Sequence, residues 1–274
     1  HKTNLGVGGA VLTGYQTAIE AGATIMVKID GDGQMDPALI PEFITPIATG
    51  EADYTKGNRF FWTDTVSQMP LIRLIGNTGL SFLTKLSSGY WNLFDPTNGF
   101  TAISTKVAEQ LPVNKISHRY FFESDMLFRL NILRAVVLDI PMHAKYGEEQ
   151  SNLKVSQEFT QFLFKNFINF SKRIAYNYFI RNFNFASLEL LFGIPLLIFG
   201  FFFGTSNWIN PPHQGALASA GTVMLAALPV IMGFQMLLGF VNYDMANIPS
   251  RPIQDRLRHG GNMLQQEQDR KSNN

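Results

Sequence analysis

Apolar and polar positions alternate between two repeating patterns over residues 1–153. Apolar residues spaced three or four apart predict helices, and short apolar runs predict strands. The predicted helices are Gly8–Ala21, Pro37–Thr49, Leu71–Leu86 and a segment near Glu123–Asn131. The predicted strands are Thr24–Ile29, Asp53–Gly57, Gly99–Ile103 and Ala135–Ile140. Helices and strands that alternate in this way indicate an α/β domain, in which helices cover a sheet.

Two long apolar blocks follow, at 186–209 and 216–241, and no Asp, Glu, Lys or Arg occurs from Leu190 to Tyr243. About 20 helical residues cross a hydrocarbon core of ~30 Å, so each block is long enough to span a bilayer once. The alternative is a buried helical hairpin, but soluble core helices rarely run so long without charge. Residues 186–243 therefore predict two transmembrane helices joined by a short external turn.

Residues 154–185 lie between the domain and the first apolar block. Their apolar side chains recur at helical spacing, with Lys165 and Lys172 on the opposite side; they are Phe159, Leu163, Phe167, Phe170, Ile174 and Tyr178. The pattern is typical of amphipathic helices at a membrane interface, and equally of a helix that packs its apolar side on the domain. Residues 244–274 become rich in Gln, Asn and charge after Arg258, and we expect a largely disordered cytoplasmic tail.

The charge distribution favours a membrane as partner. The net charge is +1 overall, but −3 over residues 1–150 and +4 over residues 151–274. Basic residues flank both apolar blocks and are absent from the turn between them, so the positive-inside rule places the domain and both termini in the cytoplasm. No nucleic-acid motif is recognisable, and the lack of cysteine excludes disulfides, thiolate ligands and a cysteine nucleophile.

The segment 27–37 carries the most informative chemistry. A buried strand ends in Asp30-Gly31-Asp32-Gly33-Gln34, and ligands of α/β sheets bind at the carboxyl ends of strands. Two carboxylates there suit Mg²⁺ or Mn²⁺, which would hold a diphosphate. An EF-hand calcium loop is excluded, because Met35 stands where that loop needs Gly and Pro41 where it needs Glu.

The run from Asn4 to Ala10 is rich in glycine and opens a predicted helix. It partly matches a dinucleotide fingerprint, but Val11 stands where a third glycine is needed, so an oxidoreductase is improbable. A helix cap with tight packing is the alternative interpretation. Because no strand precedes Asn4, we expect the chain to start inside a domain whose first strands are missing.

Together, these motifs resemble the family-2 glycosyltransferases of GT-A fold, and within them the polyprenyl-phosphate branch of dolichol-phosphate mannose synthases and bactoprenol glucosyltransferases. The resemblance covers residues 1–153 and the placement of the two spans. It implies a GT-A-type nucleotide-sugar-binding domain, incomplete at its N-terminus, followed by amphipathic interface helices and two transmembrane helices.

The resemblance also implies roles for single residues. Donor-binding positions would be Asn4, Gly6, Gly9, Asp30, Asn98 and Gly99. Metal ligands would be Asp30, Asp32 and Gln34, and catalytic acids Asp30, Asp32, Glu123 and Asp125. The acceptor phosphate would be gripped by Arg59, Arg73 and Lys145. Lys145 stands near the place where the branch has an arginine, which this sequence lacks.

The resulting hypothesis is an inverting, metal-dependent transferase. It would move a sugar from a UDP- or GDP-sugar to a polyprenyl phosphate, dolichyl or undecaprenyl, at the cytoplasmic membrane face. A sugar-hydroxyl acceptor is an alternative, and it would require Glu123 or Asp125 as a base. A non-catalytic nucleotide-sugar-binding membrane module is a second alternative. Small residues at Gly200, Gly204, Gly215 and Ser219 also offer contacts for a homo-oligomer.

Overall fold

The computed structural model describes residues 1–62, 71–143, 155–210 and 218–257. The chain divides into two compact units. The first, residues 1–173 with the segment from residue 248 onward, is called here the α/β unit. The second, residues 174–247, is called the hairpin unit. The boundary between them lies about twenty residues later than the one expected at residue 153.

The α/β unit is built on a four-stranded mixed sheet in the order β1-β3-β2-β4. Its strands are β1 (Ile25–Lys28), β2 (Tyr54–Asn58), β3 (Thr101–Ser104) and β4 (Val137–Pro141). β2 and β4 are parallel, and β3 runs antiparallel to both β1 and β2. β1, β2 and β4 therefore all end at one end of the sheet, called here the carboxyl end; they begin at the amino end.

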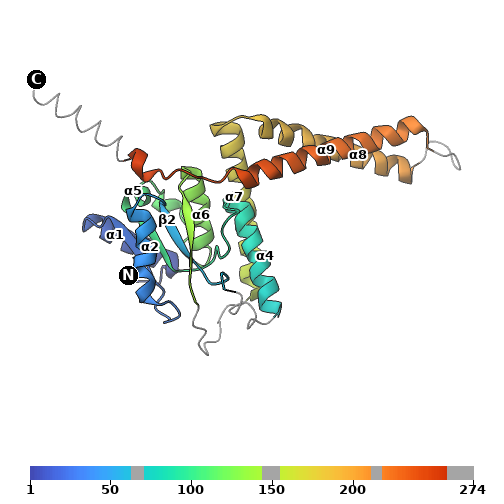
Figure 1. The fold of residues 1–274 in the computed structure, drawn as a ribbon. Helices are drawn as coiled ribbons and strands as arrows, with labels where there is room; N and C mark the ends of the chain where they lie inside the picture. The colour runs from blue at the N-terminus through green and yellow to red at the C-terminus, as the bar shows by residue number, and fades with distance from the viewer. Residues whose placement is uncertain (63–70, 144–154, 211–217, 258–274) are drawn as a thin grey trace, which may run out of the picture. The chain divides into compact units, whose positions relative to one another are not determined.

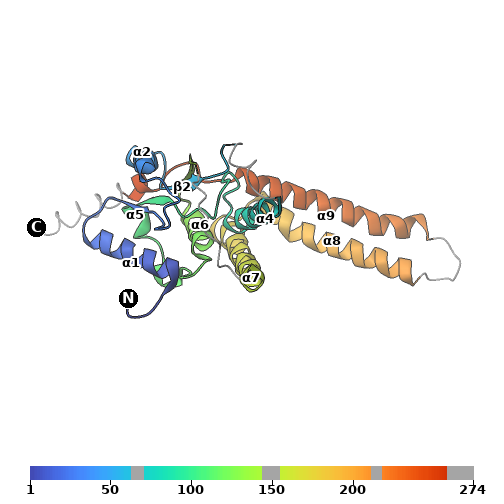
Figure 2. The same cartoon turned by 90° about the horizontal axis from the view of Figure 1, so that it is seen from below.

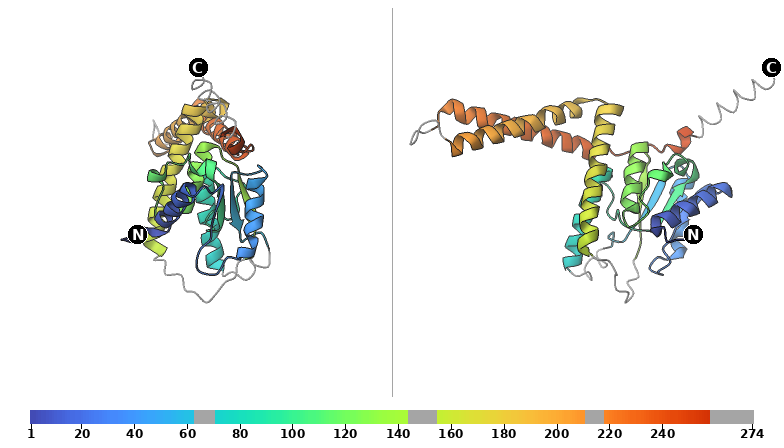
Figure 3. Two further views of the ribbon diagram at one scale, coloured as in Figure 1. Left: turned by 90° about the vertical axis from the view of Figure 1, so that its left-hand side faces the viewer. Right: turned by 180° about the vertical axis from the view of Figure 1, so that it is seen from behind.

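Helices cover both faces of this sheet, which confirms the predicted α/β fold (Figures 1 and 3). One face is covered by α2 (Ile40–Ala48), which follows the short helix η1 (Pro37–Leu39) and stacks Phe43 on Phe100. The other face packs against α1 (Gly6–Glu20), α5 (Thr105–Ala108) and α6 (Phe122–Leu133). The short helix η2 (Val113–Lys115) has no buried residue.

Two further helices, α4 (Leu71–Ser88) and α7 (Val155–Ile174), lie beside α6 (Figure 2), and polar side chains connect the three. Ser87 of α4 donates to Asn166 of α7, and Asn169 of α7 donates to Asp125 of α6. Arg173, also buried, donates to the Leu86 carbonyl. Asn166, Asn169 and Arg173 are therefore buried, whereas Leu163 and Phe167 of the predicted apolar side are exposed. Ile174, from the same predicted side, is buried, so the packing alternative is met only in part.

The hairpin unit contains a π-helical segment, η3 (Ala175–Arg181), and two long antiparallel helices, α8 (Phe185–Ile209) and α9 (Ala220–Ala246) (Figure 1). Both long helices are apolar enough to cross a membrane, each with a mean hydropathy of 2.1. They approach closely at Gly200, where a Cβ atom would lie only 2.7 Å from the Ala226 carbonyl oxygen. The two predicted spans are thus found as helices of sufficient length and composition.

The segment that follows α9 returns to the α/β unit, in contrast to the disordered tail expected from residue 244. Ile248 and Ile253 pack against the hydrophobic core. The backbone N–H groups of Ile253 and Gln254 each donate to the buried Asp53, both at 2.9 Å. A composition-based prediction missed this because the order comes from one distant carboxylate. Residues 258–274 lie outside the described part of the chain.

Candidate functional site

The carboxyl end of the sheet gathers the residues singled out by sequence. Asp30 follows β1, Arg59 follows β2, and the Asn98–Gly99 segment enters β3 from the same end. Glu123 reaches this end from the first turn of α6. Four segments that are far apart in the sequence therefore place polar side chains together, which is the usual geometry of a ligand site in an α/β sheet.

Lys28 connects two of the predicted acids. Its Nζ atom lies 2.9 Å from Asp30 Oδ1 and 3.0 Å from Glu123 Oε1. The Lys28 side chain is only 8% exposed, whereas that of Asp30 is 34% exposed. Burial lowers the pKa of Lys28, but the neighbouring Glu123 and Asp30 carboxylates outweigh it and raise the pKa above its usual value. Lys28 is thus a fixed cation that orients Asp30 and Glu123.

Gly99 makes room for this cluster. A Cβ atom at this position would collide with Asp30 Oδ2 and would lie 2.8 Å from Lys28 Nζ. The atoms that it would meet are the ends of two side chains, so the backbone of Gly99 forms part of the wall against which the Asp30 carboxylate rests. The prediction that Asn98 and Gly99 belong to the same site as Asp30 is consistent with this contact.

Lys56 lies beside the same segment and is fully buried. Its Nζ atom donates to the Asn98 carbonyl. Burial lowers the pKa of Lys56 to about 8, against the opposing effect of the Glu123 and Asp95 carboxylates. The sequence-based site omitted Lys56, because a single charged residue in a strand gives no information about its partners.

Arg59 is engaged by a carboxylate of its own chain. Its Nε atom donates to Asp95 Oδ2 at 2.6 Å, and its Nη2 atom donates to Asp95 Oδ1 at 3.0 Å. Asp95 is buried and also accepts from the side chain of Asn98. This bidentate pair fixes the loop before β3, and binding of an acceptor phosphate by Arg59 stays a prediction.

Asp139 of β4 holds the same loop from the other side. Its Oδ2 atom accepts from the Phe94 backbone N–H at 2.8 Å and from the Asn58 side chain at 3.2 Å. Its Oδ1 atom is buried without a hydrogen-bond partner in the described structure. Burial raises the pKa of Asp139 to about 6. Sequence analysis missed Asp139 because nothing in its own strand distinguishes it.

Asp32 and Gln34 lie in the exposed turn after β1, where the Gln34 backbone N–H donates to Asp32 Oδ1 at 3.0 Å. No group of three His, Asp or Glu side chains is assembled among the described residues. Mg²⁺ commonly takes one or two protein carboxylates, with water and substrate phosphates completing its shell. Binding of Mg²⁺ or Mn²⁺ by Asp30, Asp32 and Gln34 therefore stays a prediction.

Asp125 lies apart from this cluster and is buried. Its Oδ2 atom accepts from the Ser117 backbone N–H at 2.8 Å and from Arg129, and its Oδ1 atom accepts from Asn169 at 3.0 Å. Both oxygens therefore connect α6 to neighbouring structure. These contacts favour a structural role for Asp125 over the catalytic role predicted for it.

The glycine-rich segment packs against the turn before α6. Asn4 Oδ1 accepts from the Gly6 backbone N–H at 2.8 Å, and Gly6 has a φ of +80°, which favours glycine. The Gly8 backbone N–H donates to the His118 carbonyl at 2.8 Å. A Cβ at Gly9 would lie 2.6 Å from Leu5 Cβ. The packing alternative is therefore realised here, and donor binding by Asn4, Gly6 and Gly9 stays a prediction.

Two of the predicted phosphate-binding residues are not placed. Lys145 lies outside the described residues, and the side chain of Arg73 in α4 is likewise not described.

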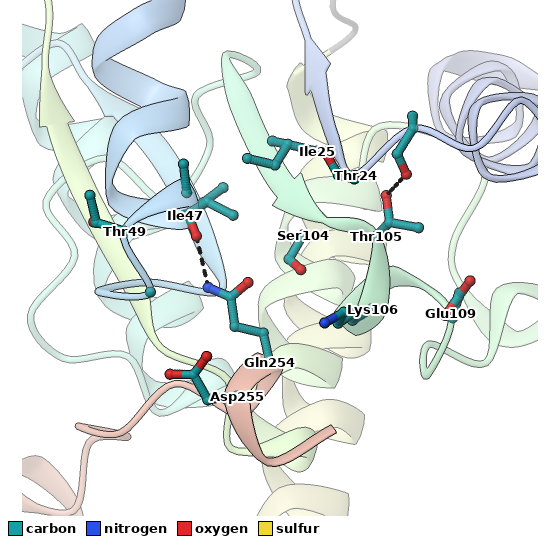
Figure 4. Close-up of a pocket in the computed structure, with 13 residues that line it drawn as sticks. Thr24, Ile25, Ile47, Thr49, Ser104, Thr105, Lys106, Glu109, Gln254 and Asp255 are labelled. Atoms are coloured by element: carbon teal, nitrogen blue, oxygen red, sulfur yellow. Dashed lines mark hydrogen bonds between the residues drawn. The ribbon is translucent and has the colours of Figure 1, made fainter. Parts of the chain in front are cut away.

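A separate cavity of about 580 Å³ lies at the amino end of the sheet (Figure 4). Its walls come from the start of β1, the end of α2, the end of β3 and the returning C-terminal segment. Gln254, one of its lining residues, donates to the Ile47 carbonyl at 3.0 Å. Because it is separated from Asp30 by the length of the strands, this cavity is not part of the predicted site.

Comparison with known proteins gives an independent view of these residues. The family model "Glycosyl transferase family 2" matches residues 1–111. The chain is 35% identical over 148 residues to UDP-N-acetylglucosamine–dolichyl-phosphate N-acetylglucosaminyltransferase from Methanococcus voltae, covering 54% of this chain and 59% of that protein. It is 27% identical over 144 residues to undecaprenyl-phosphate mannosyltransferase from Micrococcus luteus, covering 52% and 58%.

The chain thus spans about three fifths of the length of these curated relatives. Among solved structures, it is similar to glucosyl-3-phosphoglycerate synthase from Mycobacterium tuberculosis in complex with UDP. That similarity has a TM-score of 0.43 at 17% identity, and it covers 61% of this chain and 55% of the other. A similarity of this size carries no argument about the site.

Proposed function

Because the chain carries a glycosyl transferase family 2 domain segment in residues 1–111, we propose that it transfers a sugar from a nucleotide-sugar donor to a polyprenyl phosphate. One observation carries this proposal: Asp30, Lys28, Glu123 and Gly99 meet at the carboxyl end of the sheet. The relatives from Methanococcus voltae and Micrococcus luteus, whose names specify dolichyl-phosphate and undecaprenyl-phosphate acceptors, support the choice of acceptor.

The donor diphosphate would bind beside the turn after β1. Asp30, Asp32 and Gln34 would hold Mg²⁺ or Mn²⁺ there, and the cation would neutralise charge that develops on the departing nucleoside diphosphate. Lys28 holds the Asp30 carboxylate in a fixed orientation, at 2.9 Å. The Asn98–Gly99 segment would line the sugar, because it borders Asp30 directly.

The contacts of Glu123 and Asp125 favour a phosphate acceptor over a sugar hydroxyl. Glu123 is paired with the buried Lys28, and both oxygens of Asp125 accept hydrogen bonds. One oxygen of Glu123 and both oxygens of Asp125 are thus already engaged by partners inside the protein. A phosphate is already ionised near neutral pH, so its oxygen attacks the anomeric carbon without a base. The bond from that carbon to the diphosphate oxygen breaks, its electrons leave with the nucleoside diphosphate, and the configuration inverts.

A lipid-borne acceptor would be met at the membrane. α8 and α9 would anchor the chain in the bilayer, since each is long and apolar enough to span it. Phe164 and Phe167, each 66% exposed on α7, would contact lipid at the interface. The basic residues on both sides of the hairpin support a cytoplasmic location of the α/β unit, by the positive-inside rule.

The test is mass spectrometry of the lipid product. The full-length protein in membranes is supplied with UDP- and GDP-sugars, Mg²⁺ or Mn²⁺, and dolichyl or undecaprenyl phosphate. We expect one glycosylated lipid phosphate together with release of the nucleoside diphosphate. A product that carries the sugar on a hydroxyl acceptor, or no product with any donor, would contradict the proposal.

The Glu123→Gln variant separates the two enzyme mechanisms. With a phosphate acceptor, this change removes one partner of Lys28 and should lower turnover by less than about tenfold. With a hydroxyl acceptor that depends on Glu123 as base, it should lower turnover by about 10²–10⁴-fold. Glu20→Gln, on the exposed end of α1, is the matched control.

A further inference from the structure

We propose that Lys56 is a positioning residue that fixes the Asn98–Gly99 segment and supplies positive charge behind the donor diphosphate. This inference rests on the proposed function and goes beyond it. It assigns a role in donor binding to a side chain that no substrate atom can touch, since Lys56 has no exposed surface.

The first argument is the contact that Lys56 makes. The Nζ atom donates to the carbonyl of Asn98, the residue before Gly99. Gly99 in turn borders Asp30 and lies close to Lys28 Nζ. Two ammonium groups therefore approach the same short segment, Lys56 at Asn98 and Lys28 at Gly99. Any ligand that rests on this segment lies over both positive charges.

The second argument is that the segment is held tightly on the Lys56 side. A Cβ at Gly57 would lie 2.5 Å from Met142 Sδ and 2.9 Å from Asn98 Nδ2. The Asn98 side chain also donates to Asp95, which is fixed by Arg59. Asn98 is thus held through its carbonyl and its amide, and a change at Lys56 would be felt directly at Gly99.

The burial of Lys56 also affects the folding free energy. A buried cation costs folding free energy, and replacing buried ionic groups by apolar ones of similar volume is often neutral or stabilising. A methionine would remove the buried charge but would leave the Asn98 carbonyl without its Lys56 donor. An anion bound at Asn98–Gly99 would be stabilised by the Lys56 charge, because charges interact strongly where water is excluded.

Four charged groups face Lys56 from the elements packed around it. Glu123 faces it from α6, Asp95 from the loop before β3, Lys28 from β1 and Asp139 from β4. Burial is the main reason that the pKa of Lys56 falls to about 8. The ammonium is therefore charged at neutral pH and loses its proton at mildly alkaline pH, where a phosphate ligand stays fully ionised.

The experiment measures binding of UDP and GDP, with Mg²⁺, to the full-length protein in detergent between about pH 7.5 and about pH 9.5. For the unmodified protein, we expect the Kd of the preferred nucleotide to rise about tenfold across this range, as Lys56 loses its charge. Lys56→Met should bind about tenfold more weakly at pH 7.5 and show no such rise. Its melting temperature should change little, because the removal of a buried charge opposes the loss of the hydrogen bond to Asn98. A merely structural lysine would leave the Kd and its pH profile unchanged.

Lys56→Arg keeps a charge that does not titrate, so its Kd should stay level over the same range. Lys106→Met, at an exposed position, is the control and should follow the unmodified protein. A Lys56→Met protein with the Kd and pH profile of the unmodified protein would overturn the inference and leave the proposed function standing. If Lys56→Met fails to fold, the pH dependence of the Kd of Lys56→Arg tests the inference instead. A Kd that rises as in the unmodified protein would then overturn it. If the unmodified protein binds neither nucleotide, the inference and the proposed function fall together.

Discussion

The two ends of the sheet both bury charged side chains, but they satisfy them in different ways. At the amino end, Asp53 accepts hydrogen bonds from the backbone N–H groups of Val136, Ile253 and Gln254, at 2.8–2.9 Å. At the carboxyl end, Lys28 and Lys56 face carboxylates that arrive from other segments. The amino end pairs its buried carboxylate with backbone N–H groups, whereas the carboxyl end pairs side chains of opposite charge.

We expect this difference to separate charged side chains that stabilise the fold from charged side chains that take part in ligand binding. Backbone amides that surround a carboxylate are part of the folded chain and have no alternative partner, so Asp53 joins three segments. Opposed side-chain charges can exchange one partner for an incoming ion, as Asp30 would exchange part of its contact with Lys28 for a cation. Substitutions at each end of the sheet test this contrast.

The largest effect is expected from Asp30→Asn. This change keeps the size of the side chain but removes the charge that Lys28 and a cation would share. We expect sugar transfer to fall by about 10³-fold, in line with losses from removing one strongly stabilising group. The melting temperature should change little, because Asp30 is partly exposed. Transfer is measured by release of nucleoside diphosphate.

The control for Asp30 is Glu42→Gln, an exposed carboxylate in the first turn of α2. If Asp30→Asn and Glu42→Gln transferred sugar equally fast, the carboxyl end would not contain the reaction centre. The contrast between the two ends of the sheet would then have no functional meaning.

Asp53→Ala should produce the next largest effect, on stability. It leaves three backbone N–H groups without an acceptor, that of the buried Val136 and those of the partly buried Ile253 and Gln254, which costs about 3 kcal/mol in unfolding free energy. The segment that contains Ile253 and Gln254 should also detach, so limited proteolysis should cut it rapidly. Glu51→Ala, an exposed neighbour, is the control. A protein that kept its melting temperature and resisted proteolysis would show that Asp53 does not hold this segment.

The sequence was sufficient to predict most elements of the fold, because their signals are local. The segments at β1 and β2 and the charge-free blocks at α8 and α9 fell within a few residues of the predicted positions. The antiparallel direction of β3 was not predicted, since pairing direction depends on partners that are distant in sequence. The return of Ile253 to the core was missed for the same reason.

The site was predictable only where its residues belong to a motif. Asp30 was found through its turn, and Glu123 through its likeness to a family pattern. Lys28, Lys56 and Asp139 were missed, because a single charged residue in a strand gives no information about its partners. The burial of Asn166 and Asn169 on α7 also depends on partners rather than on the helix's own periodicity.

Gly99→Ala is expected to have a moderate effect that is confined to the site. The new methyl group would collide with the Asp30 carboxylate and crowd Lys28 Nζ, both of which are able to move. We expect a loss of about 10–100-fold in transfer, or about 1.4–2.8 kcal/mol, with little change in melting temperature. Gly31→Ala is a matched control, because a Cβ there has no neighbour within 4 Å. Equal activity of both variants would contradict the role of Gly99 as a wall for Asp30.

Asp139→Asn should have the smallest effect, visible only as a change in pH dependence. Burial raises the pKa of Asp139 to about 6 in the folded chain, from 3.8. Between these values the folded chain holds a proton that the unfolded chain has lost, so the unfolding free energy falls as the pH rises through this window. We expect a fall of about 1–2 kcal/mol, after allowing for partial exposure. The Asn58 amide and the Phe94 N–H still find an oxygen in the variant, whose melting temperature should lose this part of the pH dependence. An unchanged pH profile would show that the buried Asp139 carboxyl does not contribute to this pH dependence.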